Sequence, residues 1–462
     1  MAELHSPQLR ATITPKVTGP LTGGAHGWAF GAPVEDLDGR GYSFQEFLIE
    51  GVARSYRAAA GHAPGRDGLW AAEPGDTAAY KTRIMVARPI DPSKFNGVAL
   101  LNWQNVTADF DIGYPSGEEL FGGCAWVGVT AQRIGVHGMQ GVTKSLAAWD
   151  PQRYVDLHHP GDAFSYDIFA QVGRLLKGAP GVGVDPLDGL RPEVLLAMGG
   201  SQSAMRLGSY INAAQPHDKL FDGFLLSAHW GICPPVVETP LSTQFAPLDA
   251  GVLTGTSQIA DRGDAPIMVL AGETEALANF PARQPDTETF RFWEVAGVAH
   301  SDPAQAATMA AIADRDGMPF AAAPPPRNVL EWGFLRDAAL RHLIRWVREG
   351  IAPPRFPLID IVQGPNGGMI QRDELGNALG GIRLPDLAVA TGIHLGTNVN
   401  DPTYATSGES RMFDLDRMLD LHDEPEDFLM AWDGAVQDLV DGGLASPDAA
   451  ANLRRRGWVV WP

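Results

Sequence analysis

Short, unbroken apolar runs recur along this chain, each bounded by Gly, Pro, Asn or Asp. They are "RIMVARP" (83–89), "GVALLNW" (97–103), "CAWVGVT" (124–130), "EVLLAMG" (193–199), "GFLLSA" (223–228), "PIMVLAG" (266–272) and "FRFWEV" (290–295). Most of them do not alternate between apolar and polar residues. A strand that is apolar on both faces belongs in a parallel sheet covered by helices on both sides. The runs therefore predict a mostly parallel sheet enclosed by helical layers.

Helical patterns lie between these runs. Apolar residues recur at helical spacing in 163–176, from about 202 to 211, and in 340–347. The last pattern ends at Gly350, and prolines follow shortly beyond it, which is a common stop signal. Strands that alternate with helices indicate the α/β class with right-handed crossovers.

The chain of 462 residues is long enough for a large core with additions. We predict an α/β core over 1–350. The Pro-, Gly- and Thr-rich stretch 230–264 separates two strands and is predicted to be a lid or a pocket wall, because long loops in compact domains commonly serve that purpose. Residues 351–462 are predicted to form a C-terminal extension packed on the core.

The net charge of −20 argues against binding to nucleic acid and to anionic membranes, since both carry negative charge. No stretch reaches the roughly 18 continuous apolar residues of a membrane span, and no signal peptide is visible at the start. We therefore expect a soluble, cytoplasmic protein, and the sequence leaves its oligomeric state open. Cys124 and Cys233 fall at opposite ends of the predicted sheet, so two free thiols are expected.

The stretch "MGGSQSAMRL" (198–207) joins a predicted strand to a predicted helix. Such a tight turn can present a nucleophile, provided that the residues two before and two after it are small. Ser201 meets this condition through Gly199 and Ser203, whereas Ser203 is followed by the bulky Met205. Ser201 is therefore the candidate nucleophile, and Gly200 is expected to supply backbone freedom in the strained turn. The alternative is an ordinary turn with a capping serine.

The partners of such a serine follow it along the chain, first an acid and then a histidine. His300, in "WEVAGVAHSDP" (293–303), comes just after the last core strand and is the candidate general base. Glu275 and Glu273 both follow the preceding strand. We take Glu275 as the triad acid because it lies three residues after Gly272, with Glu273 as its rival. The acid would orient the imidazole and support its positive charge.

Two backbone N–H groups are expected to form the oxyanion hole. One is that of Gln202, which opens the helix after the nucleophile. The other comes from the loop after an earlier central strand, "NWQNVTADFD" (102–111), where Asn105 is our choice and Gln104 the alternative.

Several side chains near strand ends are candidates for the wall of a substrate pocket. His229 would face the same end of the sheet as the triad, although a satisfied buried histidine explains it equally well. Trp103, Trp126 and Trp230 are candidates to shape an apolar acyl pocket, and the alternative is that they are core residues. The adjacent His158 and His159 would point apart, and no second cluster has ligand spacing, so no metal site is predicted.

The segment "GGSQSA" resembles the elbow of cutinase-like and related α/β-hydrolase esterases. The wider chain is similar to a group of large bacterial α/β-hydrolase-domain proteins through "NWQNV", "AWVGVTAQRIGV", "HPGDAFSYDIF", "WEVAGVAH" and "GNALGGIRLP". This resemblance spans about residues 98–384 and implies an α/β-hydrolase fold and a serine hydrolase, with Ser201 and His300 at the matching positions. The group usually carries Asp where this chain has Glu275.

The leading hypothesis is a serine esterase that cleaves a small-molecule carboxylic ester through an acyl-enzyme, without cofactor or metal. An acyltransferase, an amidase or a lactonase would use the same triad. A non-catalytic ligand-binding protein that keeps only the fold is the alternative from another class.

Overall fold

The computed structural model describes residues 12–62, 65–139, 144–236, 256–320, 325–365, 367–398 and 400–462. A ten-stranded sheet forms the centre of this described part, in the order β10-β9-β8-β7-β4-β5-β3-β2-β1-β6. Its strands are β1 (Lys16–Thr18), β2 (Tyr42–Ala58), β3 (Ala72–Pro89), β4 (Val98–Trp103), β5 (Ala125–Val129), β6 (Val182–Gly183), β7 (Val194–Gly200), β8 (Gly223–Ser227), β9 (Ile267–Gly272) and β10 (Phe290–Val295). Every apolar run identified in the sequence thus lies in a strand of one sheet.

The sheet is mostly parallel, as predicted. All neighbours from β10 through β9, β8, β7 and β4 to β5 pair in parallel. β3 breaks this arrangement, because it pairs antiparallel with both β5 and β2. The run 83–89 therefore does not belong to the parallel part, which corrects that detail of the sequence prediction.

Both faces of the parallel strands are buried, which explains why their sequences do not alternate. In β7, Leu195 and Ala197 join the apolar cluster that includes residues of α5 (Ser165–Leu176) and α6 (Gln202–Ala213). Val194 and Leu196, which alternate with them, join a second cluster that includes residues of α10 (Gly333–Glu349). Successive side chains of a strand point to opposite faces. A helical layer on each face therefore requires apolar residues at every position.

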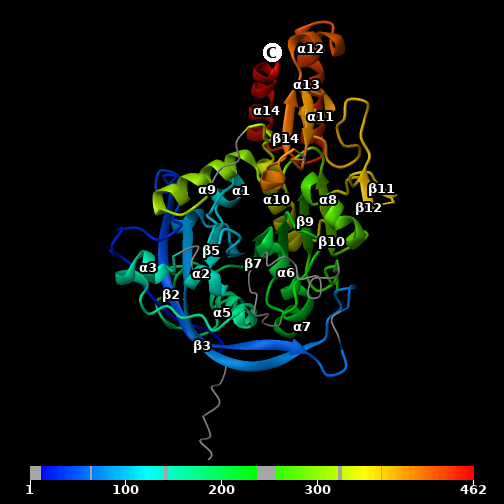
Figure 1. The fold of residues 1–462 in the computed structure, drawn as a ribbon. Helices are drawn as coiled ribbons and strands as arrows, with labels where there is room; N and C mark the ends of the chain where they lie inside the picture. The colour runs from blue at the N-terminus through cyan, green and yellow to red at the C-terminus, as the bar shows by residue number, and fades with distance from the viewer. Residues whose placement is uncertain are drawn as a thin grey trace, which may run out of the picture.

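The other helices lie around this core, apart from α11 to α14, which lie above it (Figure 1). They are α1 (Glu118–Phe121), α2 (Arg133–His137), α3 (Leu146–Trp149), α4 (Pro151–Tyr154), α7 (Gln215–Asp218), α8 (Glu273–Asn279), α9 (Pro303–Asp316), α11 (Pro385–Ala388), α12 (Leu415–Leu421), α13 (Pro425–Asp441) and α14 (Pro447–Val460). No described helix is both long and apolar enough to cross a membrane.

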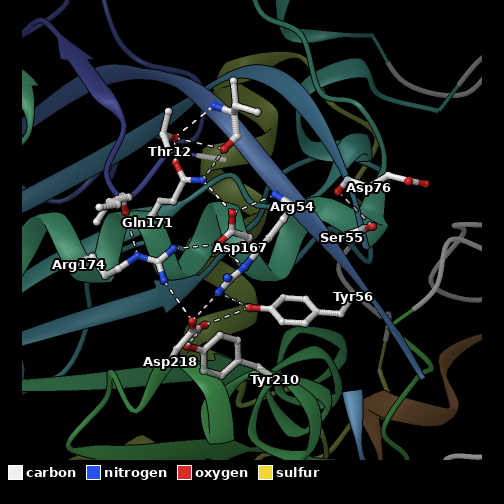
Figure 2. Close-up of polar contacts among 12 residues, drawn as sticks. Thr12, Arg54, Ser55, Tyr56, Asp76, Asp167, Gln171, Arg174, Tyr210 and Asp218 are labelled. Carbon is white, nitrogen blue, oxygen red and sulfur yellow. Dashed lines mark hydrogen bonds and ion pairs between the residues drawn. The ribbon is translucent and has the colours of Figure 1, made fainter. Parts of the chain in front are cut away.

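β2 and β3 form a long antiparallel hairpin that bends below the core (Figure 1). A buried ionic network attaches it to α5 and α7 (Figure 2). Arg54 of the hairpin lies 2.9 Å from Asp218 and 3.6 Å from Asp167, and Arg174 binds the same two carboxylates at 3.2 and 2.7 Å. Both aspartates are almost fully buried, so each charge needs its partners. α6 runs from the carboxyl edge of the sheet towards α7, which places this network at the amino edge.

The chain beyond α10 adds two small hairpins, β11 (Ile361–Gly364) with β12 (Gly367–Ile370) and β13 (Gly392–Leu395) with β14 (Glu409–Met412). β14 and α11 to α14 lie at the top of Figure 1, whereas β11 and β12 lie beside α8. Leu387 and Trp432 of this region share one apolar cluster with Leu343 of α10. The two regions therefore have a common apolar layer.

Cys124 and Cys233 are free, as the sequence predicted, and both are buried. Cys124 directly precedes β5, and Cys233 follows β8, so they lie at opposite edges of the sheet. Burial raises the pKa of Cys124 to about 11 and that of Cys233 to about 12. Neither thiol is a nucleophile at neutral pH, because the thiolate is the reactive form.

Candidate active site

Ser201 occupies the single residue between β7 and α6, at the carboxyl edge of the sheet. Its backbone has φ 55° and ψ −119°, a conformation that residues other than glycine rarely adopt. The N–H of Ser201 donates to the carbonyl oxygen of Ser227 at the end of β8, 2.8 Å away. The turn is therefore tight, strained and fixed to the neighbouring strand, which is the geometry of a nucleophile elbow.

The residues around Ser201 show why the turn closes. A Cβ on Gly199 would lie 2.8 Å from the carbonyl carbon and oxygen of Ser203, so no larger residue fits there. The hydroxyl of Ser203 both accepts from the N–H and donates to the carbonyl of Gly200, each at 2.9 Å. Ser203 is thus a bracing residue of the turn.

Gly200 does not have the role predicted from the sequence. It lies outside the left-handed region, and a Cβ there would meet nothing within 4 Å. The strain of the turn falls on Ser201 itself. The carbonyl oxygen of Gly200 matters instead, because the side-chain amide of Asn105 donates to it at 2.8 Å.

His300 and Glu275 are in direct contact. The Nδ1 atom of His300 lies 2.5 Å from Oε1 of Glu275, whose side chain is fully buried. Oε2 of the same carboxylate accepts the N–H of Gly272 at 2.7 Å. Glu275 is in the first turn of α8, and His300 follows β10, so the carboxyl ends of two adjacent strands supply the pair. The imidazole remains partly open, with 17% of its side chain exposed.

Glu273, the rival acid, faces another way. Its Oε1 binds Arg372 at 2.7 Å, and its Oε2 accepts the N–H of Gly297 at 2.8 Å. The two glutamates therefore hold different partners, and the one in contact with His300 is Glu275.

The chain after β8 connects Ser201 with His300. Ser227, at the end of β8, holds the N–H of Ser201, and three residues later the ring of Trp230 lies 5.2 Å from that of His300, centroid to centroid. Trp230, proposed from the sequence as a pocket residue, is thus next to the candidate base. The candidate nucleophile and base flank the same strand end.

The two predicted oxyanion donors are located at the same edge. Gln202 is the first residue of α6, where N–H groups have no partner within the helix. Asn105 follows β4, and its side chain is fixed on both sides: Nδ2 donates to Gly200, and Oδ1 accepts the N–H of Thr107 at 2.7 Å. The alternative donor, the N–H of Gln104, already donates to the carbonyl of Val129 at 3.1 Å.

The side chain of Gln202 belongs to a buried polar chain that the sequence reasoning missed. Its Nε2 donates to Oε1 of Gln132 at 3.0 Å, and Nε2 of Gln132 donates to Asp162 at 3.3 Å. All three residues are at most 3% exposed. Gln132 comes three residues after the end of β5, so its position shortly after a buried strand was the available signal.

Trp103 is not on an accessible pocket wall, contrary to the prediction. It is fully buried in the core, and its indole N–H donates to Oε1 of Gln132 at 3.1 Å. Trp126 is likewise a core residue. Trp103, the last residue of β4, packs in the apolar cluster that includes residues of α5 and α6, so its position at the strand end did not imply exposure.

His229 is buried, and burial lowers its pKa to about 4. Its Nδ1 accepts the N–H of Gly231 at 3.0 Å. Its Nε2 is buried without a hydrogen-bond partner in the described part of the chain. His229 is thus a buried histidine that is only half satisfied, which corrects the second interpretation given to this residue. Of the predicted lid 230–264, residues 237–255 lie outside the described part of the chain.

A narrow crevice lies between the loop after β4 and α9. Its lining includes Phe30, Phe110, Ile112, Tyr114, Met309 and Ile312. Ile112 donates its N–H to the carbonyl of Asn105 at 2.7 Å, so the crevice starts beside a candidate oxyanion residue. Its other wall is the helix that follows His300.

His159 is buried, with Nε2 2.8 Å from the carbonyl oxygen of Ala131. Within the described ranges, no group of three or more His, Cys, Asp or Glu side chains has an arrangement that suits a metal ion.

Among solved structures, esterase Est22 is similar at 12% identity and a TM-score of 0.30, covering 58% of this chain and 82% of that one. An esterase from Rhizomucor miehei gives 11% identity and a TM-score of 0.27, covering 58% and 84%. An alpha-beta serine hydrolase homologue from Coxiella burnetii gives 12% and 0.26, covering 48% and 84%. No curated protein matches the sequence. A family model described as "Alpha/beta hydrolase domain" matches residues 17–455, and the chain, with its mostly parallel sheet between helical layers, belongs to this alpha/beta hydrolase family.

Proposed function

We propose that this protein is a serine hydrolase that cleaves a carboxylic ester through an acyl-enzyme. The observation that carries the proposal is the buried contact between Glu275 and His300, at the same sheet edge as the strained Ser201. A histidine held at Nδ1 by a carboxylate presents Nε2 as a base, and a serine on a tight elbow presents its hydroxyl. The esterases among the similar structures agree with this class of chemistry.

In the first half of the reaction, Ser201 Oγ attacks the ester carbonyl carbon while His300 Nε2 takes the hydroxyl proton. The N–H groups of Gln202 and Asn105 bind the oxyanion of the tetrahedral intermediate. The intermediate then expels the alcohol, which leaves with the proton from His300. Glu275 keeps the imidazole in the required tautomer and stabilises its positive charge without taking the proton.

In the second half, His300 takes a proton from water, and the hydroxide attacks the acyl carbon. The carboxylic acid is released, and Ser201 regains its proton. These steps use residues of this chain alone.

The test combines turnover of p-nitrophenyl acetate with covalent labelling by a fluorophosphonate. We expect the wild-type protein to hydrolyse the ester and to carry one adduct on Ser201, located by mass spectrometry of peptides. Ser201→Ala should lose both signals, whereas Ser203→Ala, which removes only a bracing hydroxyl, should still be labelled at Ser201. A wild-type protein without adduct or turnover would contradict the proposal and favour a non-catalytic role.

A further inference from the structure

The segment that carries His300 is held by residues far away in sequence, from the chain beyond α10. Ile382 adds to the end of β10: its N–H donates to the carbonyl of Glu294 at 2.7 Å, and its carbonyl accepts the N–H of Ala296 at 2.9 Å. Further on, the N–H of Ser301 donates to the carbonyl of Thr406 at 3.4 Å. The turn 296–301 is therefore fixed on both sides by the C-terminal region.

Glu273 makes the most direct link between this turn and the C-terminal region. One carboxylate oxygen accepts the N–H of Gly297, and the other accepts from Arg372 at 2.7 Å and from the N–H of Gly396 at 3.3 Å. The carboxylate is 2% exposed, while the Arg372 side chain is 31% exposed. Hydrogen bonds to a buried charge are the strong ones. Glu273 thus joins one residue of the turn to two of the extension.

Thr274 makes a second link, directly at the candidate base. Its hydroxyl oxygen accepts the N–H of His300 at 2.8 Å, and the hydroxyl donates to the carbonyl of Gly396. Gly396 itself packs so closely that a Cβ there would lie 2.6 Å from Glu273 Cβ and from the Thr274 nitrogen. The backbone of the extension thus lies directly against the start of α8, where Glu275 is also located.

Asn328 adds a third connection. Its amide donates to the carbonyl of Gly297 at 2.6 Å and to that of Leu395 in β13 at 3.1 Å. These contacts converge on one turn and on one strand of the extension.

From these contacts we infer that the extension is part of the catalytic unit, with Glu273 and Arg372 as positioning residues that fix the turn of His300. The inference rests on the proposed function, because it concerns the geometry of the same base. It also assigns a role to Glu273, which the sequence analysis kept as the rival of Glu275. A displacement of about 1 Å in a catalytic group can cost on the order of 100-fold in rate. Loss of this link therefore affects turnover more than substrate binding.

The experiment compares Arg372→Ala, Arg372→Lys, Glu273→Gln and the double variant Glu273→Gln/Arg372→Ala in the full-length protein. For Arg372→Ala we expect kcat on p-nitrophenyl acetate to fall on the order of 10- to 100-fold, with KM within about twofold. Arg372→Lys keeps the charge and should retain most of the rate. The double variant should lose no more kcat than the less active of the two single variants, because the two residues act as one unit.

Arg454→Ala is the matched control. Arg454 lies on α14, and its guanidinium binds Asp433 at 2.5 Å, away from the turn of His300. The Arg454→Ala variant also removes an arginine and an ion pair from the C-terminal region. Because this ion pair does not contact the turn of His300, the kcat of the variant should equal that of the wild type. Thermal unfolding of each variant shows that it is folded.

Several outcomes decide whether Glu273 and Arg372 position the turn of His300. If folded Arg372→Ala and Glu273→Gln both keep kcat within twofold of the wild type, the positioning role is wrong. If Arg372→Ala does not fold, Glu273→Gln decides alone, since it preserves the shape of the side chain. If the wild type itself shows neither fluorophosphonate adduct nor turnover, the proposed function fails. Normal wild-type labelling with unaffected variants overturns only this inference.

Discussion

The Nδ1 atom of His300 and Oε1 of Glu275 are 2.5 Å apart, and the carboxylate is fully buried. We expect Glu275→Gln to lower kcat on the order of 10³- to 10⁴-fold at neutral pH, because a neutral amide neither fixes the tautomer nor supports the imidazolium. The rate is measured with p-nitrophenyl acetate, and circular dichroism checks the fold. Glu275→Asp, which keeps the charge on a shorter side chain, serves as the control and should retain more activity than Gln. Equal rates for Glu275→Gln and the wild type would remove Glu275 from the triad.

Gly199 and Gly200 form a matched pair for testing the elbow. A Cβ on Gly199 would lie 2.8 Å from the backbone of Ser203, whereas one on Gly200 would meet nothing within 4 Å. We expect Gly199→Ala to destabilise the protein by about 1–3 kcal/mol and to abolish activity, because α6 must move and Ser201 moves with it. Gly200→Ala should remain close to the wild type in both respects. Urea unfolding and ester turnover measure the two effects, and equal behaviour of the variants would contradict this steric account.

The strain at Ser201 has a measurable consequence for stability. With φ 55° and ψ −119°, a residue with a Cβ is held in a conformation that glycine adopts freely. Such a conformation costs about 1–3 kcal/mol. A glycine at position 201 would avoid this cost, but part of the gain is lost because glycine has greater freedom in the unfolded chain. We expect Ser201→Gly and Ser201→Ala to be equally inactive, with the Gly variant more stable by about 1 kcal/mol. Urea unfolding that shows the Ala variant to be as stable as the Gly variant would argue against strain at the elbow.

The parallel part of the sheet was predictable from the sequence, because burial on both faces leaves continuous apolar runs such as 193–199. The hairpin of β2 and β3 was not. Its strands mix buried and half-buried positions, and they bury charged residues such as Arg83 and Glu46, which bind each other at 2.8 Å. Charged residues in a sequence give no sign of burial when their partners come from another strand.

In the candidate site, local spacing selected Ser201 as the candidate nucleophile, and position after a strand selected His300 as the candidate base. The distinction between Glu275 and Glu273 depends on which partners surround the first turn of α8. Arg372 and Gly396 determine where Glu273 binds, and both come from a region whose placement no local pattern reveals. Contacts of this kind, between segments that are distant in the chain, cannot be predicted from local patterns in one sequence.

Three buried histidines predict how stability depends on pH. Burial lowers the pKa of His159 and His229 to about 4 and that of His394 to about 3, against about 6.5 in an unfolded chain. Below about pH 6.5 the unfolded chain therefore binds protons that the folded chain does not. The free energy of unfolding should fall between pH 6.5 and 4, by about 1 kcal/mol per pH unit for each histidine.

Urea unfolding at pH 7.5 and 5.0 measures this slope. His159→Gln is the informative variant, because its amide can still donate to the carbonyl of Ala131 while it cannot titrate. The variant should show a shallower decline than the wild type. An identical slope would mean that His159 takes up a proton in the folded protein as readily as in the unfolded one.

Asn105 connects the loop after β4 to the elbow, and a substitution that changes only its Nδ2 atom tests this connection. Its Nδ2 donates to the carbonyl of Gly200, while its Oδ1 accepts the N–H of Thr107. Asn105→Asp keeps the acceptor for Thr107 and replaces the donor with an oxygen that faces the Gly200 carbonyl. We expect kcat to fall by about 5- to 13-fold, since a lost hydrogen bond of about 1–1.5 kcal/mol corresponds to that factor, and the repulsion displaces the carbonyl next to Ser201. Thr107→Ala, which retains the backbone N–H, is the control and should leave kcat unchanged. A normal rate for folded Asn105→Asp would show that the elbow holds its geometry without this loop.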